Sequence, residues 1–335
     1  MDENVLLVEN VTVRFPVYGG LVHAVERVSL EIPRGKTVGI VGESGCGKSV
    51  LALSLLRLLP KSALVDGAVR LAGTEAQSNV LALPENSRSL KKIRGGELSM
   101  IFQEPMRALF PLKTIGSQLG EAIRLHVTRD PAEIRQRSVA LLRTVGIREA
   151  EKRLSDYPHQ FSGGMAQRVM IAIALAASPK LLIADEPTTA LDVTIQAQVL
   201  RLIRRMQREL GMSVLFITHD MAVMMEMADE VAVMYLGRIV ERADAEVVFT
   251  RPLHPYTRRL IEAIPTIDGA RRRLASIEGS VPIPLNLKPC CGFHDRCQNA
   301  IAGLCDRKSP ELREAEPGHF VSCFLFQLEG GRADD

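Results

Sequence analysis

Short apolar runs alternate with longer amphipathic segments along most of this chain. Continuous apolar runs bounded by polar residues are typical of buried strands, and apolar residues that recur every three or four positions are typical of helices. Because strands and helices alternate, we expect an α/β protein. The expected buried strands are 38–41, 98–102, 181–187 and 213–218, and the main expected helices are 50–59, 165–177 and 196–210.

Three regions depart from this alternation. Residues 6–14 alternate loosely and are rich in valine, and residues 28–32 form a second expected strand, so we expect an antiparallel β subdomain here. Residues 112–147 carry apolar positions at helical spacing and predict an α-helical insertion. From about residue 254, proline and then cysteine become frequent, so we expect an irregular appended region rather than more sheet. The expected division is a core of residues 1–253, with a helical subdomain at about 105–178, and a C-terminal extension of residues 254–335.

Composition narrows the function classes. A net charge of +3 over 335 residues is too small to indicate a nucleic-acid partner, and the absence of Trp argues against a base-stacking surface. No uncharged apolar run reaches the 18 residues of a membrane span. Because the first residues lack the basic and apolar parts of a signal peptide, we expect the chain to stay in the cytoplasm.

A glycine-rich octapeptide between an expected strand and an expected helix carries the main chemistry. It matches G-x-x-x-x-G-K-[ST], the phosphate-binding loop, in which backbone N–H groups and a helix N-terminus cradle phosphate oxygens. Lys48 would reach the β- and γ-phosphates, and the Ser49 hydroxyl would hold Mg²⁺. The alternative is a glycine turn that binds no ligand. The loop consists of Gly42, Glu43, Ser44, Gly45, Cys46, Gly47, Lys48 and Ser49.

Other polar residues stand where expected strands end or helices begin. Asp185 and Glu186 follow a buried strand, where two carboxylates are costly unless a cation or a reacting group uses them. The alternative is that they cap the next helix. Ser162 opens an apolar helix, either as its N-cap or as part of a phosphate site. His219 follows the next buried strand, at the edge where ligands of α/β sheets bind.

The order of these motifs resembles the ATP-binding subunits of ATP-binding-cassette (ABC) transporters. That family carries, between the phosphate loop and the switch histidine, a glutamine loop, a serine–glycine signature and an aspartate loop. The resemblance covers about residues 5–250. The matching residues are the phosphate loop at 42–49, Gln103, the signature Phe161-Ser162-Gly163-Gly164-Met165, Asp185-Glu186, Ala190-Leu191-Asp192 and His219.

The resemblance implies a role for the residues around each ATP. Phe15 matches the position of an aromatic side chain that stacks on adenine. Gln103 and Asp185, together with the phosphate-loop serine, would hold Mg²⁺. Glu186 would activate the attacking water, and His219 would contact the γ-phosphate. Gln103, Glu186 and His219 are therefore the expected catalytic residues.

The resemblance also implies a head-to-tail dimer. Each ATP would lie between the phosphate loop of one subunit and the signature of the other, so Ser162, Gly163, Gly164 and Asp192 would serve the nucleotide in trans. Met165 stands where glutamine is commoner in the family. An isolated subunit is expected to bind ATP but to hydrolyse it poorly.

Further segments look like the dipeptide/oligopeptide permease ATPases, and more like the first of their two ATPase chains than the second. This implies a second, homologous ATPase subunit, two membrane permease subunits and an extracytoplasmic peptide-binding protein, with no nucleic acid. One departure is Arg107-Ala108-Leu109-Phe110-Pro111, where relatives commonly carry an asparagine. The matching segments are Val41–Gly45, Arg94-Gly95, Ile101–Met106, Tyr157–Phe161 and Pro252–Thr257.

The expected function is therefore ATP hydrolysis that energises a bacterial importer of di- or oligopeptides, at the cytoplasmic face of the inner membrane. Two alternatives stay open. One is the ATPase of a related importer of nickel, glutathione or another small solute, or of an exporter. The other is a non-transport ABC ATPase acting on DNA or ribosomes, although such proteins usually carry two cassettes or a long coiled-coil insertion.

Five of the six cysteines fall in the last fifth of the chain. In a cytosolic protein this predicts metal binding rather than disulfides, although the spacing matches no common zinc or ferredoxin pattern. The resemblance implies a [4Fe-4S] cluster, with Cys290 able to compete for one ligand position. The alternative is that the thiols are free and buried. The implied ligands are Cys291, Cys297, Cys305 and Cys323.

Overall fold

The computed structural model describes residues 3–73, 79–189, 191–264 and 279–327. Ala190 of the expected aspartate loop therefore lies outside the described residues, as do parts of the expected extension. The described chain forms two compact units. The first unit contains Met1–Leu6, Glu31–Lys36 and Arg70–Ile217, and the second contains Leu7–Leu30, Thr37–Val69 and Thr218–Asp335.

The first unit is built on three parallel strands, β5 (Leu98–Ile101), β6 (Leu181–Asp185) and β7 (Ser213–Thr218). Strand β6 pairs with β5 on one side and with β7 on the other. Every residue of the three strands is buried, which is typical of a parallel sheet covered on both faces. The strands expected from the apolar runs are therefore confirmed.

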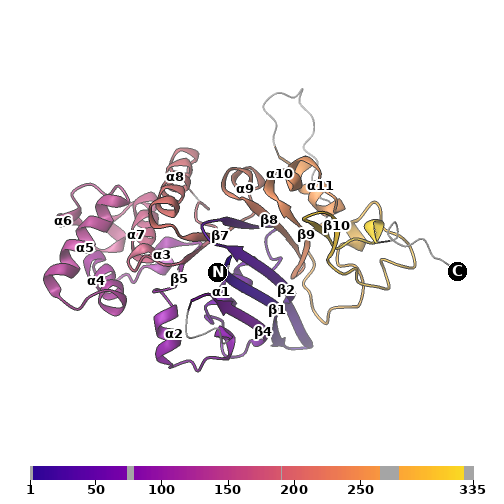
Figure 1. Cartoon of the computed structure of the whole chain (residues 1–335), viewed down its shortest axis with the longest axis horizontal. Helices are drawn as coiled ribbons and strands as arrows, with labels where there is room; N and C mark the ends of the chain where they lie inside the picture. The colour runs from indigo at the N-terminus through magenta and orange to yellow at the C-terminus, as the bar shows by residue number, and fades with distance from the viewer. Residues whose placement is uncertain (1–2, 74–78, 190, 265–278, 328–335) are drawn as a thin grey trace. The chain divides into compact units, whose positions relative to one another are not determined.

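Helices α4 (Ile115–His126), α5 (Pro131–Thr144) and α7 (Gly163–Leu175) pack against one another in the same unit, with α6 (Ala150–Arg153) against α5. Figure 1 shows them as one group of helices. The expected helical insertion is therefore present, as two helices separated by a break. The unit also contains α2 (Arg88–Ile93), α3 (Pro105–Ala108), α8 (Val193–Leu210) and the 3₁₀ turns η1 (Val80–Ala82) and η2 (Pro158–Gln160).

The second unit contains most of a three-stranded sheet in the order β2-β1-β4. The valine-rich strands β1 (Asn4–Val17) and β2 (Gly20–Pro33) are longer than the sequence predicted, and β4 is Leu64–Leu71. A second group of strands begins with β3 (Thr37–Val41), which pairs in parallel with β8 (Glu230–Tyr235). Strand β8 pairs antiparallel with β9 (Arg238–Asp244), and the unit also contains α1 (Lys48–Leu55), α9 (Met221–Met227) and α10 (Ala245–Thr250).

The C-terminal region corrects one expectation. Most of its described residues are irregular, as the sequence predicted, but it also adds strands to the sheet. Strand β11 (His319–Val321) pairs antiparallel with β9 and with β10 (Arg313–Glu316). The expectation that this region adds no sheet was therefore wrong. Its other elements are α11 (Pro255–Glu262), η3 (His294–Arg296) and η4 (Phe324–Phe326).

Candidate functional site: a phosphate loop, a paired glutamate and an arginine-lined cavity

The phosphate loop joins β3 to α1 in the second unit, in the strand–loop–helix order that the sequence predicted. Lys48 is the first residue of α1 and is 4% exposed. Its ammonium group donates hydrogen bonds to the carbonyl oxygens of Gly42 (2.8 Å) and Glu43 (3.0 Å). The lysine thus lies inside the curve of the loop, where its charge faces the space that phosphate oxygens take in loops of this kind.

The glycine spacing of the loop has a steric cause. Gly47 has φ +106° and a Cβ placed there would lie 2.1 Å from the carbonyl oxygen of Ala24, so that any side chain is excluded. Cys46, which stands between Gly45 and Gly47 in the loop, is almost completely buried. Burial raises the pKa of its thiol, an effect that the neighbouring Lys48 ammonium opposes.

The carboxylates at the end of β6 lie in the first unit, and both are buried. Glu186 has a left-handed backbone conformation, with φ +46°. Its Oε2 accepts hydrogen bonds from Gln103 Nε2 (2.9 Å) and from Thr189 Oγ1 (2.8 Å). The structure therefore brings two of the three expected catalytic residues into contact, and it adds Thr189, which the sequence analysis missed.

The alternative in which Asp185 and Glu186 cap the following helix is wrong. That helix, α8, begins at Val193, and its N-cap is Asp192, whose side chain accepts from the N–H of Ile195 (3.0 Å). A buried pair of carboxylates at a strand end without a capping task is typical of a site that handles a cation or a reacting water.

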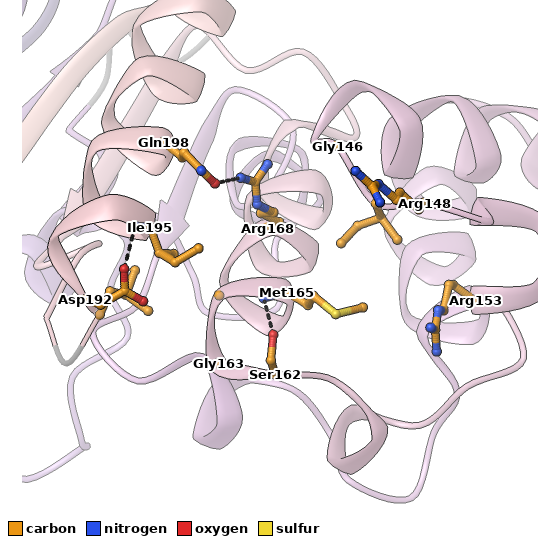
Figure 2. Close-up of a pocket in the computed structure, with 13 residues that line it drawn as sticks. Gly146, Arg148, Arg153, Ser162, Gly163, Met165, Arg168, Asp192, Ile195 and Gln198 are labelled. Carbon is orange, nitrogen blue, oxygen red and sulfur yellow. Dashed lines mark hydrogen bonds between the residues drawn. The ribbon is translucent and has the colours of Figure 1, made fainter.

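The signature residues line a cavity of about 650 Å³ in the first unit (Figure 2). Ser162 is the N-cap of α7 and accepts from the N–H of Met165 (3.4 Å), so the structural reading of this serine is confirmed. Ser162, Gly163, Gly164 and Asp192 all border the cavity, as the trans site predicts for residues that serve one ligand. The two glycines at the start of α7 keep the backbone N–H groups accessible there.

The same cavity is lined by arginines that the sequence analysis missed, Arg148, Arg153 and Arg168. Arg168 donates to the carbonyl oxygen of Val145 (2.7 Å) and to Gln198 Oε1 (2.7 Å), and it stands one helical turn beyond Gly164. The spacing of four residues between Gly164 and Arg168 places both on one face of the helix, and this is the feature of the sequence from which the position of Arg168 could have been predicted. Arg153 is also ion-paired with Asp156 (2.8 Å), but three guanidinium groups against the carboxylates of Asp156 and Asp192 still leave an excess of positive charge, which suits a phosphate-bearing ligand.

Two expected nucleotide contacts, Phe15 and His219, lie in the second unit. Phe15 is half-buried near the end of β1, shortly before the turn at Gly19. His219 is exposed between β7 and α9, next to Asp220, which caps α9. Their roles toward adenine and the γ-phosphate stay predictions.

The four expected cluster ligands gather in the C-terminal region. The pKa of Cys291 is raised to about 12, mainly by burial and also by the nearby Cys305, Cys323 and Cys297, against the effect of a backbone hydrogen bond from Phe293. Within the described residues, however, no group of three or more His, Cys, Asp or Glu side chains is arranged to hold a metal ion. In number and kind the four thiols fit an iron–sulfur cluster, whereas their arrangement in this structure is not that of a metal site.

No helix in the part of the chain that the structure describes has both the length and the apolar composition needed to span a bilayer. Comparison with solved structures finds the ATP-binding cassette MJ0796, in a dimeric post-hydrolysis state bound to ADP and Pi. It is 27% identical, with a TM-score of 0.62 over 72% of this chain and 98% of that one. The structure of cbiO1 from Clostridium perfringens, part of the ABC transporter complex cbiONQ, gives a TM-score of 0.60 at 28% identity over 75% of this chain and 92% of that one.

Sequence comparisons agree with the fold. The ABC transporter family model matches residues 25–189, and the model of the oligopeptide/dipeptide transporter C-terminal region matches residues 240–305. The oligopeptide transport ATP-binding protein AppD of Bacillus subtilis is 49% identical over 92% of each chain. OppD of Escherichia coli, also an oligopeptide transport ATP-binding protein, is 44% identical over 95% of this chain and 92% of its own length. The chain belongs to the ATP-binding subunits of ABC transporters, in the group that carries the oligopeptide/dipeptide transporter C-terminal region, and is an ATPase of that family.

Proposed function

We propose that this ATPase energises the import of di- or oligopeptides across the bacterial inner membrane. The observation that carries the proposal is the match of nearly the whole chain, C-terminal region included, to relatives named for oligopeptide transport. The proposed domain division follows it, with a nucleotide-binding domain at 1–253, including a helical part at about 105–178, and an extension at 254–335.

The proposed chemistry uses the residues described above. Glu186, held by Gln103 and Thr189, takes a proton from the water that attacks the γ-phosphorus of ATP, and ADP leaves. Lys48 balances the negative charge of the β- and γ-phosphates. Mg²⁺, held by Ser49, Gln103 and Asp185, would supply further charge neutralisation on the phosphate oxygens.

The remaining roles complete one nucleotide site from two chains. Phe15 stacks on adenine and His219 contacts the γ-phosphate in the chain whose phosphate loop binds the ATP. The signature and Asp192 serve the nucleotide of the partner, where the electropositive cavity receives its phosphates. The proposed partner is a second, homologous ATPase, and the pair acts with two membrane permease subunits and an extracytoplasmic peptide-binding protein.

The location follows from these partners: the chain is peripheral, at the cytoplasmic face of the membrane, held by the permease subunits. The proposal also includes a [4Fe-4S] cluster on Cys291, Cys297, Cys305 and Cys323, which is supported by the gathering of these thiols. Such a cluster would cross-link segments of the extension. Iron and sulfide analysis, with the visible absorption spectrum after anaerobic purification, tests it: a colourless, iron-free protein would contradict the cluster.

The function is tested with the complete transporter reconstituted in vesicles. Wild-type complex is expected to take up labelled dipeptides or oligopeptides in the presence of ATP. Glu186→Gln should lower ATP hydrolysis about 10²–10⁴-fold, the usual contribution of a general base, and should stop uptake while ATP still binds. Glu104→Gln is the matched control, because the Glu104 carboxylate is exposed and forms a surface ion pair with Arg107 (2.8 Å). Uptake of nickel or glutathione in place of peptides would reject the proposed substrate class.

A further inference from the structure

One residue of the C-terminal region makes a two-point contact with the phosphate loop. Arg296, the last residue of η3, donates from Nη1 to Glu43 Oε2 (2.8 Å) and from Nη2 to Glu43 Oε1 (2.9 Å). The Arg296 side chain is 8% exposed and that of Glu43 is 26% exposed. Bidentate arginine–carboxylate pairs fix orientation as well as distance, and water competes little for a pair that is mostly buried.

Glu43 is also held through its backbone. Its N–H donates to the hydroxyl of Tyr256 (2.8 Å), at the start of α11. The Tyr256 ring packs against Tyr235 and Phe293, with ring centroids 4.7 and 5.3 Å away, and Arg296 Nη1 also donates to the Tyr235 hydroxyl (3.3 Å). The second residue of the phosphate loop is therefore anchored by its side chain and by its N–H to residues that follow the nucleotide-binding core.

The same region holds the turn that follows Phe15. Asn286 Oδ1 accepts from the N–H of Leu21 (3.0 Å), and its Nδ2 donates to the carbonyl oxygen of Gly19 (3.1 Å). The N–H of His23 donates to the carbonyl oxygen of Pro284 (2.9 Å). The C-terminal region thus contacts both the phosphate loop and the turn that follows Phe15, the residue predicted to stack on adenine.

We propose that Arg296 is a positioning residue for ATP binding, through which the C-terminal region holds the phosphate loop in its binding conformation. The Lys48 ammonium bonds to the carbonyl oxygens of Gly42 and Glu43, so the pose of Glu43 also sets the place of the lysine charge. A loop that is already ordered loses less conformational entropy when it closes on phosphate. The proposal rests on ATP binding by this chain.

The test is the dissociation constant of ATP for the full-length chain, measured by calorimetry with Mg²⁺ present. Arg296→Gln is expected to raise it about tenfold, which corresponds to about 1.4 kcal/mol. Glu43→Gln should have a similar effect, and the double variant should be no weaker than either single variant, because both remove the same contact. Arg296→Lys, which keeps the charge but loses the fork, should recover part of the affinity.

The matched control is Arg313→Gln, in the same region, where an arginine donates from two nitrogens to the exposed Glu311. It should leave ATP affinity unchanged. All variants are compared at a temperature at which their thermal unfolding curves show the native state, so that loss of fold is separated from loss of affinity. Wild-type affinity in Arg296→Gln, or additive losses in the double variant, would overturn the positioning role. A wild-type chain that fails to bind ATP would instead contradict the ATPase assignment.

Discussion

The buried carboxylate of Glu241 offers the sharpest test of how the C-terminal strands are attached. Glu241 lies in β9 and is completely buried. Its Oε1 accepts from the N–H of Leu253 (2.6 Å) and from His319 Nε2 (2.7 Å), and its Oε2 accepts from the N–H of His254 (2.9 Å). One carboxylate therefore joins β9, the start of α11 and β11.

The expected cost of Glu241→Gln follows from these partners. The best amide orientation keeps its oxygen toward Leu253 and His319 and turns its NH₂ toward the N–H of His254, where two donors face each other. One charge-assisted hydrogen bond, worth about 1.5–3 kcal/mol, is lost and a buried N–H is left without an acceptor, at about 1–3 kcal/mol. The unfolding free energy should therefore fall by about 2.5–6 kcal/mol, a large share of the roughly 5–15 kcal/mol that holds a domain folded.

Urea unfolding followed by circular dichroism measures this loss, and limited proteolysis shows whether residues beyond β9 become accessible first. Glu314→Gln is the matched control, because Glu314 lies in β10 of the same sheet, is exposed and accepts from the N–H of Gly318. It should change the free energy by less than about 0.5 kcal/mol. If Glu241→Gln unfolded within 1 kcal/mol of wild type, roughly the worth of one ordinary hydrogen bond, the reasoning from buried donors would be refuted.

Two further predictions concern the nucleotide loop and pH. Gly47→Ala should abolish ATP binding, because the added Cβ would clash with the Ala24 carbonyl oxygen. Gly35→Ala, at φ +69° and with open space around it, should lower the unfolding free energy by only the roughly 1–2 kcal/mol of a left-handed residue. Calorimetry with ATP and thermal unfolding compare the two variants, and ATP binding by Gly47→Ala would contradict the predicted clash. Burial lowers the pKa of His254 to about 3 in the folded chain, whereas the unfolded chain has the ordinary value of about 6.5. Below pH 6.5 the unfolded chain therefore binds one more proton than the folded chain, and the unfolding free energy should fall by up to about 1.4 kcal/mol per pH unit as pH drops toward 3. His254→Asn keeps a side-chain acceptor at the N-cap of α11, so it should remove this dependence of the unfolding free energy on pH. Urea unfolding at pH 7, 6 and 5 measures it, and an unchanged dependence in the variant would show that other groups cause it.

Local patterns in the sequence predicted much of the phosphate loop. Glycines at fixed positions reflect short-range sterics, as at Gly47, and a continuous apolar run such as β3 can only be buried. The cap at Ser162 was also predictable, since an N-cap bonds to a backbone group three residues ahead. In each case the cause lies within a few residues of the effect.

Contacts between distant residues were not predictable in this way. Gln103 and Glu186 are 83 positions apart, and Arg296 and Glu43 are 253 positions apart. No local spacing pattern in a single sequence predicts contacts between residues so far apart. Strand β11 is only three residues long, His319, Phe320 and Val321, which is too short for an alternating pattern to stand out. Its pairing with β9 depends on Glu241 and on tertiary packing, which override local propensity.

The pairing of β11 with β9 has a consequence for synthesis of the chain. Strand β9 is complete by residue 244, yet one of its edges finds its partner only when residues 319–321 have left the ribosome. Until then that edge presents unpaired backbone N–H and C=O groups, which can recruit strands of other nascent chains. Translation that stops between residues 244 and 319 should therefore yield aggregation-prone fragments, because β11, which pairs with the exposed edge of β9, is made last.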